Sequence, residues 1–173
     1  MSKTIADIPA KDDCDVRFKF REAVEEDIPA LIRLFKETIP EVYGQILPKE
    51  VLKPWIEGER LREDVGHLWH YSIVAEEADE IVAASARIED LIALIWVHPA
   101  HHKKGIGSAL LDIVEREIIK SGYETAKLDC FSKNDRAMRF YMKRGWKPSY
   151  EEMDNVVGAL KTMMIKTLAK AKE

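Results

Sequence analysis

One stretch, residues 91–111, organises the pattern of apolar and polar positions along the chain. Leu91–Val97 is an unbroken apolar run rich in Ile and Val, which predicts a buried strand. Residues 98–104 are polar and basic. From Gly105 apolar residues recur at helical spacing, which predicts a helix to about Lys120. The stretch therefore predicts a strand that passes through a tight turn into a helix.

Before residue 91, apolar and polar positions first alternate, as in a strand, and then recur at helical spacing. Residues 15–21 alternate apolar and polar positions, which predicts a half-buried strand. Residues 25–40 begin with acids and carry an apolar stripe, which predicts an amphipathic helix that ends before Pro40. A second helix opened by Pro48 is predicted to be interrupted within residues 58–64, by a glycine or by the charged run after it.

The remaining segments are mostly strands. We predict strands over 67–76, 80–88, 125–131, 146–152 and 156–165, and a helix that Asn134 caps and Gly145 ends.

The order β-α-α-β-β-β-α-β-α-β-β predicts an α/β (α+β) fold. We expect a mixed, largely antiparallel sheet of six to seven strands flanked by four helices. Residues 1–14 are polar and aperiodic and are expected to form a loose leader. Residues 15–168 are long enough to form one domain with its own core, and 169–173 are expected to be a short tail.

Composition narrows the class of protein. No apolar run approaches the length of a membrane span, and the first residues contain no apolar signal core. Cys14 lies in the polar leader and Cys130 in an apolar strand, so we expect no disulfide and a cytoplasmic protein. Cys130 could serve as a nucleophile or as a small buried apolar residue.

Charge is distributed unevenly between the two parts of the chain. Residues 1–90 carry 12 Lys and Arg against 21 Asp and Glu, whereas residues 91–173 carry 15 against 10. A basic part with an anion-binding turn suits a polyanionic ligand, and an acidic part favours a cationic partner such as an amine. Both parts can also be ordinary solvated surface. The total of −4 and the lack of a motif argue against nucleic acid, and no membrane partner is expected.

The turn between the strand and the helix has the features of an anion site. Helix N-termini present free N–H groups and the positive end of the helix dipole. Gly105 and Gly107 allow close approach to the main chain, and Lys103 and Lys104 add positive charge. A phosphate therefore fits here. The loop matches neither the Walker motif nor the dinucleotide fingerprint, and the alternative is a flexible helix start without a ligand.

Two motifs resemble those of the GNAT superfamily of acyl-CoA-dependent N-acetyltransferases. Residues 102–107, HKKGIG, resemble its pyrophosphate loop Gln/Arg-x-x-Gly-x-Gly/Ala, except that His102 stands where the family has Gln or Arg. Residues 134–146 resemble Asn-x-x-Ala-x-x-Phe/Leu-Tyr-x-x-x-Gly-Phe/Trp and begin 27 positions after Gly107. This second motif is matched at Asn134, Ala137, Phe140, Tyr141, Gly145 and Trp146.

The resemblance implies acetyl-CoA as co-substrate, bound between the strands that carry residues 91–97 and 125–131. The pantetheine amides are expected to pair with the free strand edge at Ile95, Trp96 and Val97. Asn134 and Ala137 are expected beside the pantetheine arm, with Tyr141 beside the sulfur. The expected pyrophosphate site consists of His102, Lys103, Lys104, Gly105, Ile106, Gly107 and Ser108.

Amide formation needs an oxyanion donor, an acid and a base. The main-chain N–H of Val97 is the expected donor. The resemblance implies that Tyr141 protonates the departing thiolate, although it can also be a core tyrosine. Asp129 stands where some bacterial ribosomal-protein N-acetyltransferases carry an acidic base, and burial would raise its pKa, unless it faces outward. Glu89 and Asp90 are the reserve candidates.

Several alternatives stay open. The acceptor is expected to be a primary amine: a polyamine-like molecule, an amino compound or a protein N-terminus. In the family the region around Tyr43 and Trp55 forms one wall of the acceptor site, but both can also be packing residues. A catalytically silent acyl-CoA sensor and, less strongly, a nucleotide-binding regulator are the other functional readings. The histidines show no metal-ligand spacing, so no metal is expected. The apolar final strand, 156–165, predicts a homodimer because an exposed edge of that kind is usually covered.

Overall fold

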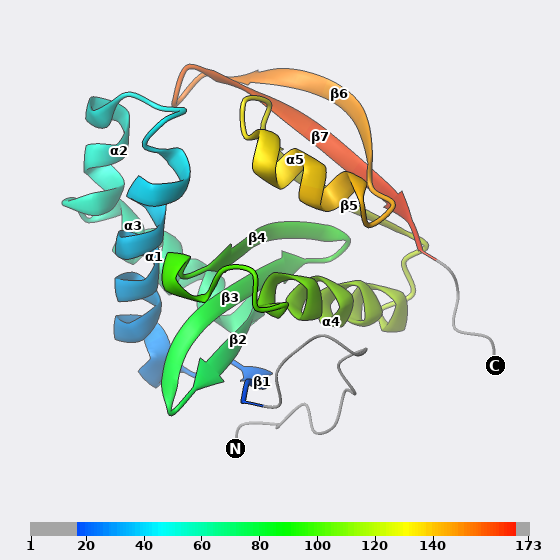
Figure 1. Ribbon diagram of the computed structural model, residues 1–173, viewed down its shortest axis with the longest axis horizontal. Coiled ribbons are helices and arrows are strands. Elements are labelled where there is room, and N and C mark those ends of the chain that lie inside the picture. The colour runs from blue at the N-terminus through cyan, green and yellow to red at the C-terminus, as the bar shows by residue number, and fades with distance from the viewer. Residues whose placement is uncertain (1–16, 169–173) are drawn as a thin grey trace.

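A seven-stranded sheet with the strand order β1-β2-β3-β4-β5-β7-β6 forms the centre of the fold. The computed structural model describes residues 17–168 (Figure 1). Neighbouring strands run antiparallel except β4 and β5, which are parallel, so the predicted α/β (α+β) class with a largely antiparallel sheet is confirmed. The strands are β1 (Lys19–Glu22), β2 (Ser72–Glu77), β3 (Glu80–Ile88), β4 (Leu91–Val97), β5 (Thr125–Phe131), β6 (Lys147–Asp154) and β7 (Ala159–Thr167).

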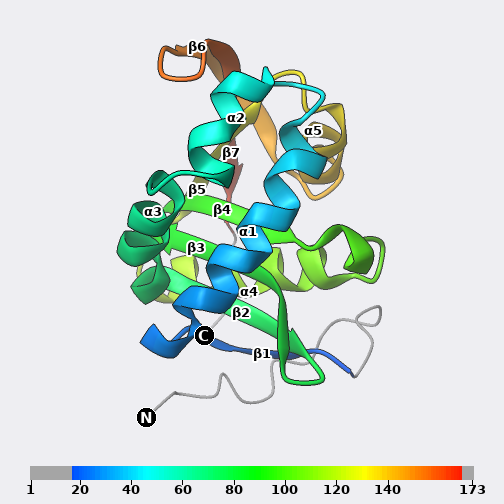
Figure 2. The ribbon, with the colours of Figure 1, turned by 90° about the vertical axis from the view of Figure 1, so that its left-hand side faces the viewer.

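The helices cover both faces of the sheet (Figures 1 and 2). One face packs against α1 (Ile28–Tyr43), α2 (Lys49–Ile56) and α3 (Arg60–Leu68) through one apolar cluster. The other face packs against α4 (Ile106–Lys120) and α5 (Asp135–Met142) through a second cluster. The alternating apolar residues of the strands therefore meet a helical stripe on each side.

Strands β4 and β5 pair over only a short length. β4 pairs with β5 at two register positions, Leu91 with Lys127 and Ile92 with Leu128, and within the described strands the pairing goes no further. Beyond these positions the two strands diverge (Figure 1). The second halves of β4 and β5 therefore leave a gap in the middle of the sheet.

A buried polar network on α4 connects the two sides of this gap. The Lys166 ammonium on β7 donates to both carboxylate oxygens of Glu115, at 2.9 and 2.7 Å. The Trp146 indole N–H also donates to Glu115, at 2.9 Å, and both Trp146 and Glu115 are buried. A buried carboxylate is tolerated because all these donors satisfy it. Glu115 thus ties the helix after β4 to the β6–β7 hairpin.

The structure corrects the predicted end of the first long helix. α1 continues through Pro40 to Tyr43 instead of ending before the proline. Proline lacks one helical N–H, but the helix buries Leu34, Phe35 and Ile39 against the sheet. The free energy gained by this packing outweighs the loss of the hydrogen bond at Pro40. Helix propensity alone does not predict this outcome, because it takes no account of tertiary packing.

The segment predicted to interrupt the second helix forms a helix of its own. α3 spans Arg60–Leu68, so the fold has five α-helices instead of four among the described residues. Leu61 and Val65 are buried one helical turn apart, and they hold this charged helix against α1. The strand predicted from residue 67 begins only at Ser72, because the chain stays helical through residues 69–71.

The final strand is not at an edge of the sheet. β7 lies between β5 and β6, and the edge strand is β6, with exposed side chains at Tyr150 and Met153. The reason given for the homodimer was therefore wrong, and the homodimer itself stays a prediction. The predicted leader 1–14 and tail 169–173 lie outside the described residues. None of the described helices is long and apolar enough to cross a membrane.

Candidate active site

The gap between β4 and β5 is a cleft of about 690 Å³. Its two ends differ, and we name them by the helix at each end. The α4 half is lined by Val97, His102, Lys103, Gly105, Ile106, Gly107, Ser108, Asn134, Arg136, Ala137, Phe140 and Tyr141. The α1 half is lined mainly by Phe35, Thr38, Ile39, Val42, Tyr43, Trp55, Leu61, Asp64, Leu68, Leu94, Trp96, Asp129, Phe131 and Lys161.

The uncapped N-terminus of α4 lies in the α4 half. Gly105 adopts φ +79°, a conformation that glycine accepts without strain, and it offers no side chain to cap the helix. The first helical hydrogen bond runs from the Ala109 N–H to the Gly105 carbonyl, at 3.0 Å. The N–H groups of Ile106, Gly107 and Ser108 therefore have no acceptor within the helix. Together with the helix dipole they favour an anion in the cleft.

The exposed edge of β4 faces the same cleft. The His98 N–H donates to the Val82 carbonyl on β3, at 2.9 Å. Because main-chain groups of successive strand residues point to opposite sides, the N–H groups of Val97 and Ile95 point away from β3 and into the gap. β4 thus offers hydrogen-bonding groups that no neighbouring strand uses.

His102 packs back onto the end of this strand. Its Nε2 lies 2.8 Å from the Val97 carbonyl oxygen, which requires the Nε2–H tautomer as donor. Burial lowers the pKa of His102, and the nearby Arg136 guanidinium acts in the same direction. The ring is therefore a neutral donor near pH 7. This hydrogen bond holds the turn against the end of β4, a role of His102 that the sequence did not predict.

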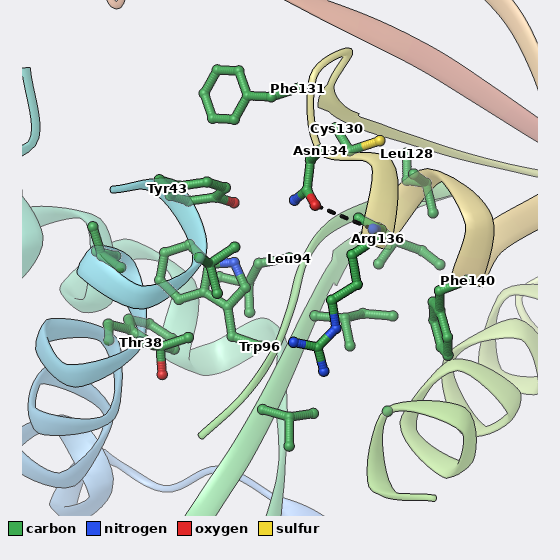
Figure 3. A pocket seen from close by; sticks show the side chains of 18 of the residues that line it. Thr38, Tyr43, Leu94, Trp96, Leu128, Cys130, Phe131, Asn134, Arg136 and Phe140 are labelled. Atoms are coloured by element: carbon green, nitrogen blue, oxygen red, sulfur yellow. Dashed lines mark hydrogen bonds between the residues drawn. The ribbon is translucent and has the colours of Figure 1, made fainter. Parts of the chain in front are cut away.

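α5 borders the cleft on the side of β5. The Asn134 side chain accepts from the Ala137 N–H at 3.2 Å, so the predicted cap is confirmed (Figure 3). Tyr141 lines the cleft but is only 9 % exposed and packs against Phe140 and Trp146. Burial raises the pKa of Tyr141 well above its usual value, and the neighbouring Cys130 and Tyr43 add to this. The phenol therefore keeps its proton at neutral pH.

Asp129 lines the cleft on the opposite face of β5 from Cys130. Of the two alternatives for Asp129, a buried and an outward-facing side chain, the structure shows the second, because the side chain is 38 % exposed. The Lys161 ammonium lies 3.5 Å from its carboxylate. Asp129 is thus a solvent-accessible carboxylate beside a lysine.

Most of the predicted site residues come together here. Lys104 is not among the lining residues, because its ammonium turns to His101 Nδ1 at 3.4 Å. Glu89 and Asp90 do not line the cleft either, and Asp90 pairs with Lys127 at 2.9 Å. The predicted residues that line the cleft are Ile95, Trp96, Val97, His102, Lys103, Gly105, Ile106, Gly107, Ser108, Asp129, Asn134, Ala137 and Tyr141.

Sequence analysis missed two arginines: Arg136 lines the α4 half, and Arg144 lies beside it. Arg136, on the first turn of α5, is exposed and reaches into the cleft (Figure 3). Arg144 follows α5, hydrogen-bonds the Ser108 hydroxyl and lies 5.2 Å over the Phe140 ring. Both add positive charge close to the start of α4. Only their positions within the second motif could have drawn attention to them.

Cys130 and the histidines have ordinary surroundings. The Cys130 thiol contacts the Met138 sulfur at 3.1 Å, and burial raises its pKa to about 11, which disfavours a thiolate nucleophile. His98 pairs with Glu37 at 2.8 Å and His101 with Glu77 at 3.1 Å. Within residues 17–168 no group of three or more His, Cys, Asp or Glu side chains is arranged to hold a metal ion.

The sequence matches the acetyltransferase (GNAT) family over residues 28–146. The protein belongs to this family. Members of the family use acetyl-CoA, and acetyl transfer is the activity that the family supports for this chain. Among curated proteins none matches the sequence significantly.

Solved structures of GNAT acetyltransferases share the fold. An N-acetyltransferase from Rhodopseudomonas palustris is 19 % identical with a TM-score of 0.75, covering 86 % of this chain and 94 % of that one. The PaiA N-acetyltransferase from Thermoplasma acidophilum, solved with coenzyme A, is 20 % identical with a TM-score of 0.73, covering 87 % and 98 %. The ribosomal-protein-S18-alanine N-acetyltransferase from Escherichia coli is 16 % identical with a TM-score of 0.66, covering 90 % and 97 %.

Proposed function

We propose that the protein transfers the acetyl group of acetyl-CoA to a primary amine by direct attack, in a single ternary complex. The observation that carries this proposal is the parting of β4 from β5 with the uncapped N-terminus of α4 in the gap. A long ligand with amides in its middle and phosphates at one end fits such a cleft, because strand edge and helix terminus offer matching donors.

The residues of the α4 half divide this binding task. The main chain at Ile95 and Val97 would pair with the pantetheine amides, and residues 102–108 would hold the pyrophosphate. The main chain of Trp96, also expected to pair with the amides, is directed to Ala84 on β3 instead. Asn134 and Ala137 would border the pantetheine arm. Gly107 suits the close approach, because a Cβ there would stand 3.6 and 3.7 Å from Val97 and Phe140, toward the cleft lining. Arg136 and Arg144 would add charge beyond the predicted set.

The chemistry needs three protein groups. The Val97 N–H, directed into the gap, would donate to the oxyanion formed when the amine attacks the thioester carbonyl. Tyr141, with its raised pKa, holds a proton for the departing thiolate. Asp129 would accept the amine proton through a water molecule, since its carboxylate is exposed to the cleft.

A thiol-release assay tests the proposal. Acetyl-CoA is mixed with the protein and a set of primary amines, and free coenzyme A and N-acetylated product are measured together. We expect both to appear in equal amounts and to depend on amine. Tight acetyl-CoA binding without amine-dependent release would contradict the proposal and favour the silent acyl-CoA sensor instead.

A further inference from the structure

Five aromatic rings line the α1 half of the cleft. Four of them are connected by ring contacts, and we call these four the aromatic wall: Phe35, Tyr43, Trp96 and Phe131. The Phe35 and Trp96 ring centroids are 4.6 Å apart, Tyr43 and Trp96 are 6.1 Å apart, and Tyr43 and Phe131 are 5.1 Å apart, all edge to face. Trp96 comes from β4, Phe131 from β5, and Tyr43 from α1. The wall therefore bridges the gap between the two diverging strands (Figure 3).

The aromatic wall offers apolar surface to the cleft. Phe35 and Phe131 are buried, but Tyr43 and Trp96 are only half-buried and line the cavity. Burial raises the pKa of Tyr43 to about 12, so its phenol is neutral. Aliphatic side chains complete the surface: Ile39, Val42, Leu61, Leu68 and Leu94. A ligand that covers these groups gains free energy in proportion to the apolar area it buries.

Charges are few in the α1 half. Asp64 and Asp129 are its lining carboxylates, and Lys161 is its lining ammonium. Lys161 lies 2.8 Å from Asp154, 3.5 Å from Asp129 and 5.4 Å above the Phe131 ring. Lys161 would repel an acceptor with several ammonium groups. Besides Asp129, such an acceptor would find one carboxylate, Asp64, among the described lining residues. The charge pattern therefore favours an acceptor with a single positive charge.

The hairpin between β6 and β7 packs against the apolar cluster that borders the α1 half. Val157, in the turn between β6 and β7, is buried in the same apolar cluster as Leu52 and Tyr43. Figures 1 and 2 show the tip of this hairpin beside the connection between α1 and α2. The hairpin tip is therefore part of the apolar packing around the α1 half.

We propose that the acceptor is a small primary amine that carries one apolar ring or branched alkyl group and a single positive charge. This inference rests on the proposed acetyl transfer. The neutral amine nitrogen forms the amide C–N bond, and the thioester C–S bond breaks. The amine proton goes to Asp129 through water, and the thiolate takes a proton from Tyr141 to leave as coenzyme A. The aromatic wall would hold the apolar group of the acceptor.

An acceptor panel tests the substrate class. The probes are 2-phenylethylamine, ethylamine, spermidine and a tetrapeptide that begins with alanine, each with saturating acetyl-CoA. We expect kcat/KM for 2-phenylethylamine to exceed the values for the other three by at least about tenfold, because only it covers the wall. Preference for spermidine or for the tetrapeptide would overturn the inference and leave acetyl transfer intact. Acetyl-CoA binding without turnover of any probe would overturn the proposed function and this inference with it.

A pair of tryptophan variants locates the preference. Trp96→Leu removes the central ring of the wall. Trp69→Leu removes a half-buried tryptophan that stacks on His70 at 3.8 Å and does not line the cleft. The readout is the ratio of kcat/KM for 2-phenylethylamine to that for ethylamine. A loss of folded protein or of acetyl-CoA binding lowers both values by the same factor and leaves this ratio unchanged. We expect this ratio to fall about tenfold in Trp96→Leu and to hold in Trp69→Leu. An unchanged ratio in Trp96→Leu would overturn the role of the wall.

Discussion

The two halves of the cleft are built by different means. In the α4 half main-chain N–H groups face the cavity beside the side chains, and they are fixed by a helix start, a strand edge and a few polar ties such as His102 to Val97. In the α1 half the lining groups are side chains, mostly aromatic and aliphatic, contributed by three helices and three strands. Main-chain groups suit a ligand that stays the same among related proteins, because substitutions leave these groups in place. A surface of side chains, in contrast, changes with each substitution. With acetyl-CoA in the α4 half, as proposed, the acceptor would meet the half whose surface changes with single substitutions.

The largest expected effect concerns the α4 half. Gly107→Asp would bring a carboxylate to the N–H groups that would hold the pyrophosphate, and its Cβ would make only ordinary contacts within the protein. We expect acetyl-CoA affinity to fall on the order of a thousandfold, since juxtaposed like charges cost several kcal/mol. Calorimetric titration measures this loss. Gly66→Asp is the matched control, because a Cβ at Gly66 meets nothing within 4 Å and Gly66 does not line the cleft. Equal affinity in the two variants would remove the α4 terminus from the binding site.

The next effect concerns the tie between α4 and the β6–β7 hairpin. Glu115→Ala leaves the Lys166 ammonium and the Trp146 indole N–H without their partner. We expect the free energy of unfolding to fall by about 3 kcal/mol, in the range for breaking a buried ion pair. Urea denaturation measures it. Glu117→Ala, on the same helix, breaks an exposed pair with Lys120 and should cost less than about 0.5 kcal/mol. A similar small cost for both would mean that the tie contributes little.

The third effect separates chemistry from packing at Tyr141. Tyr141→Phe removes the hydroxyl and keeps the ring contacts with Phe140 and Trp146. We expect kcat to fall roughly 10²-fold with acetyl-CoA affinity unchanged, the pattern of a group that acts in the transition state. Tyr150→Phe, at an exposed tyrosine of β6, is the control and should leave kcat intact. Full turnover of Tyr141→Phe would instead point to solvent as the proton source.

The smallest effect is a dependence of stability on pH at the turn after β4. Burial lowers the pKa of His102, so the folded protein binds this proton less readily than the unfolded chain. The stabilisation is complete above the unfolded pKa, near about 6.5, and is lost as the pH falls below it. His102→Gln keeps a donor for the Val97 carbonyl but cannot titrate. Its urea midpoint should therefore decline less between pH 7 and pH 5.5 than that of the parent. Identical declines would mean that His102 titrates alike in both states.

The contrast between the halves also explains what the sequence could predict. The α4 half depends on local features, namely Gly105, the Asn134 cap and the spacing of two motifs, and each can be recognised within a dozen residues. Most of the residues predicted from these features line the cleft. Lys104 and the reserve acids Glu89 and Asp90 do not line it, because the direction of a surface side chain follows from its partners, not from its position in the sequence.

The α1 half depends on tertiary packing and was therefore harder to predict. Gly58 or the charged residues 59–64 were predicted to interrupt a helix. In the structure, the burial of Leu61 and Val65 instead stabilises α3 over the charged residues. The spacing of these two residues was the available signal. Similarly, α1 runs through Pro40 because its apolar stripe is buried, and only then does Tyr43 reach the cleft. The aromatic wall combines residues far apart in the sequence, so no local sequence pattern predicts it.

The gap in the sheet has a consequence for how the protein avoids self-association. A free strand edge with unused N–H and carbonyl groups can template pairing with another extended chain, which is the first step of fibril growth. Here that edge lies inside the molecule, between α1 on one side and α5 on the other, instead of on the outer border of the sheet. His102 occupies the last carbonyl of β4, and Pro99 follows two residues later. An intruding strand would thus find very few groups to pair with, so the open edge of β4 is protected from pairing with a neighbouring molecule.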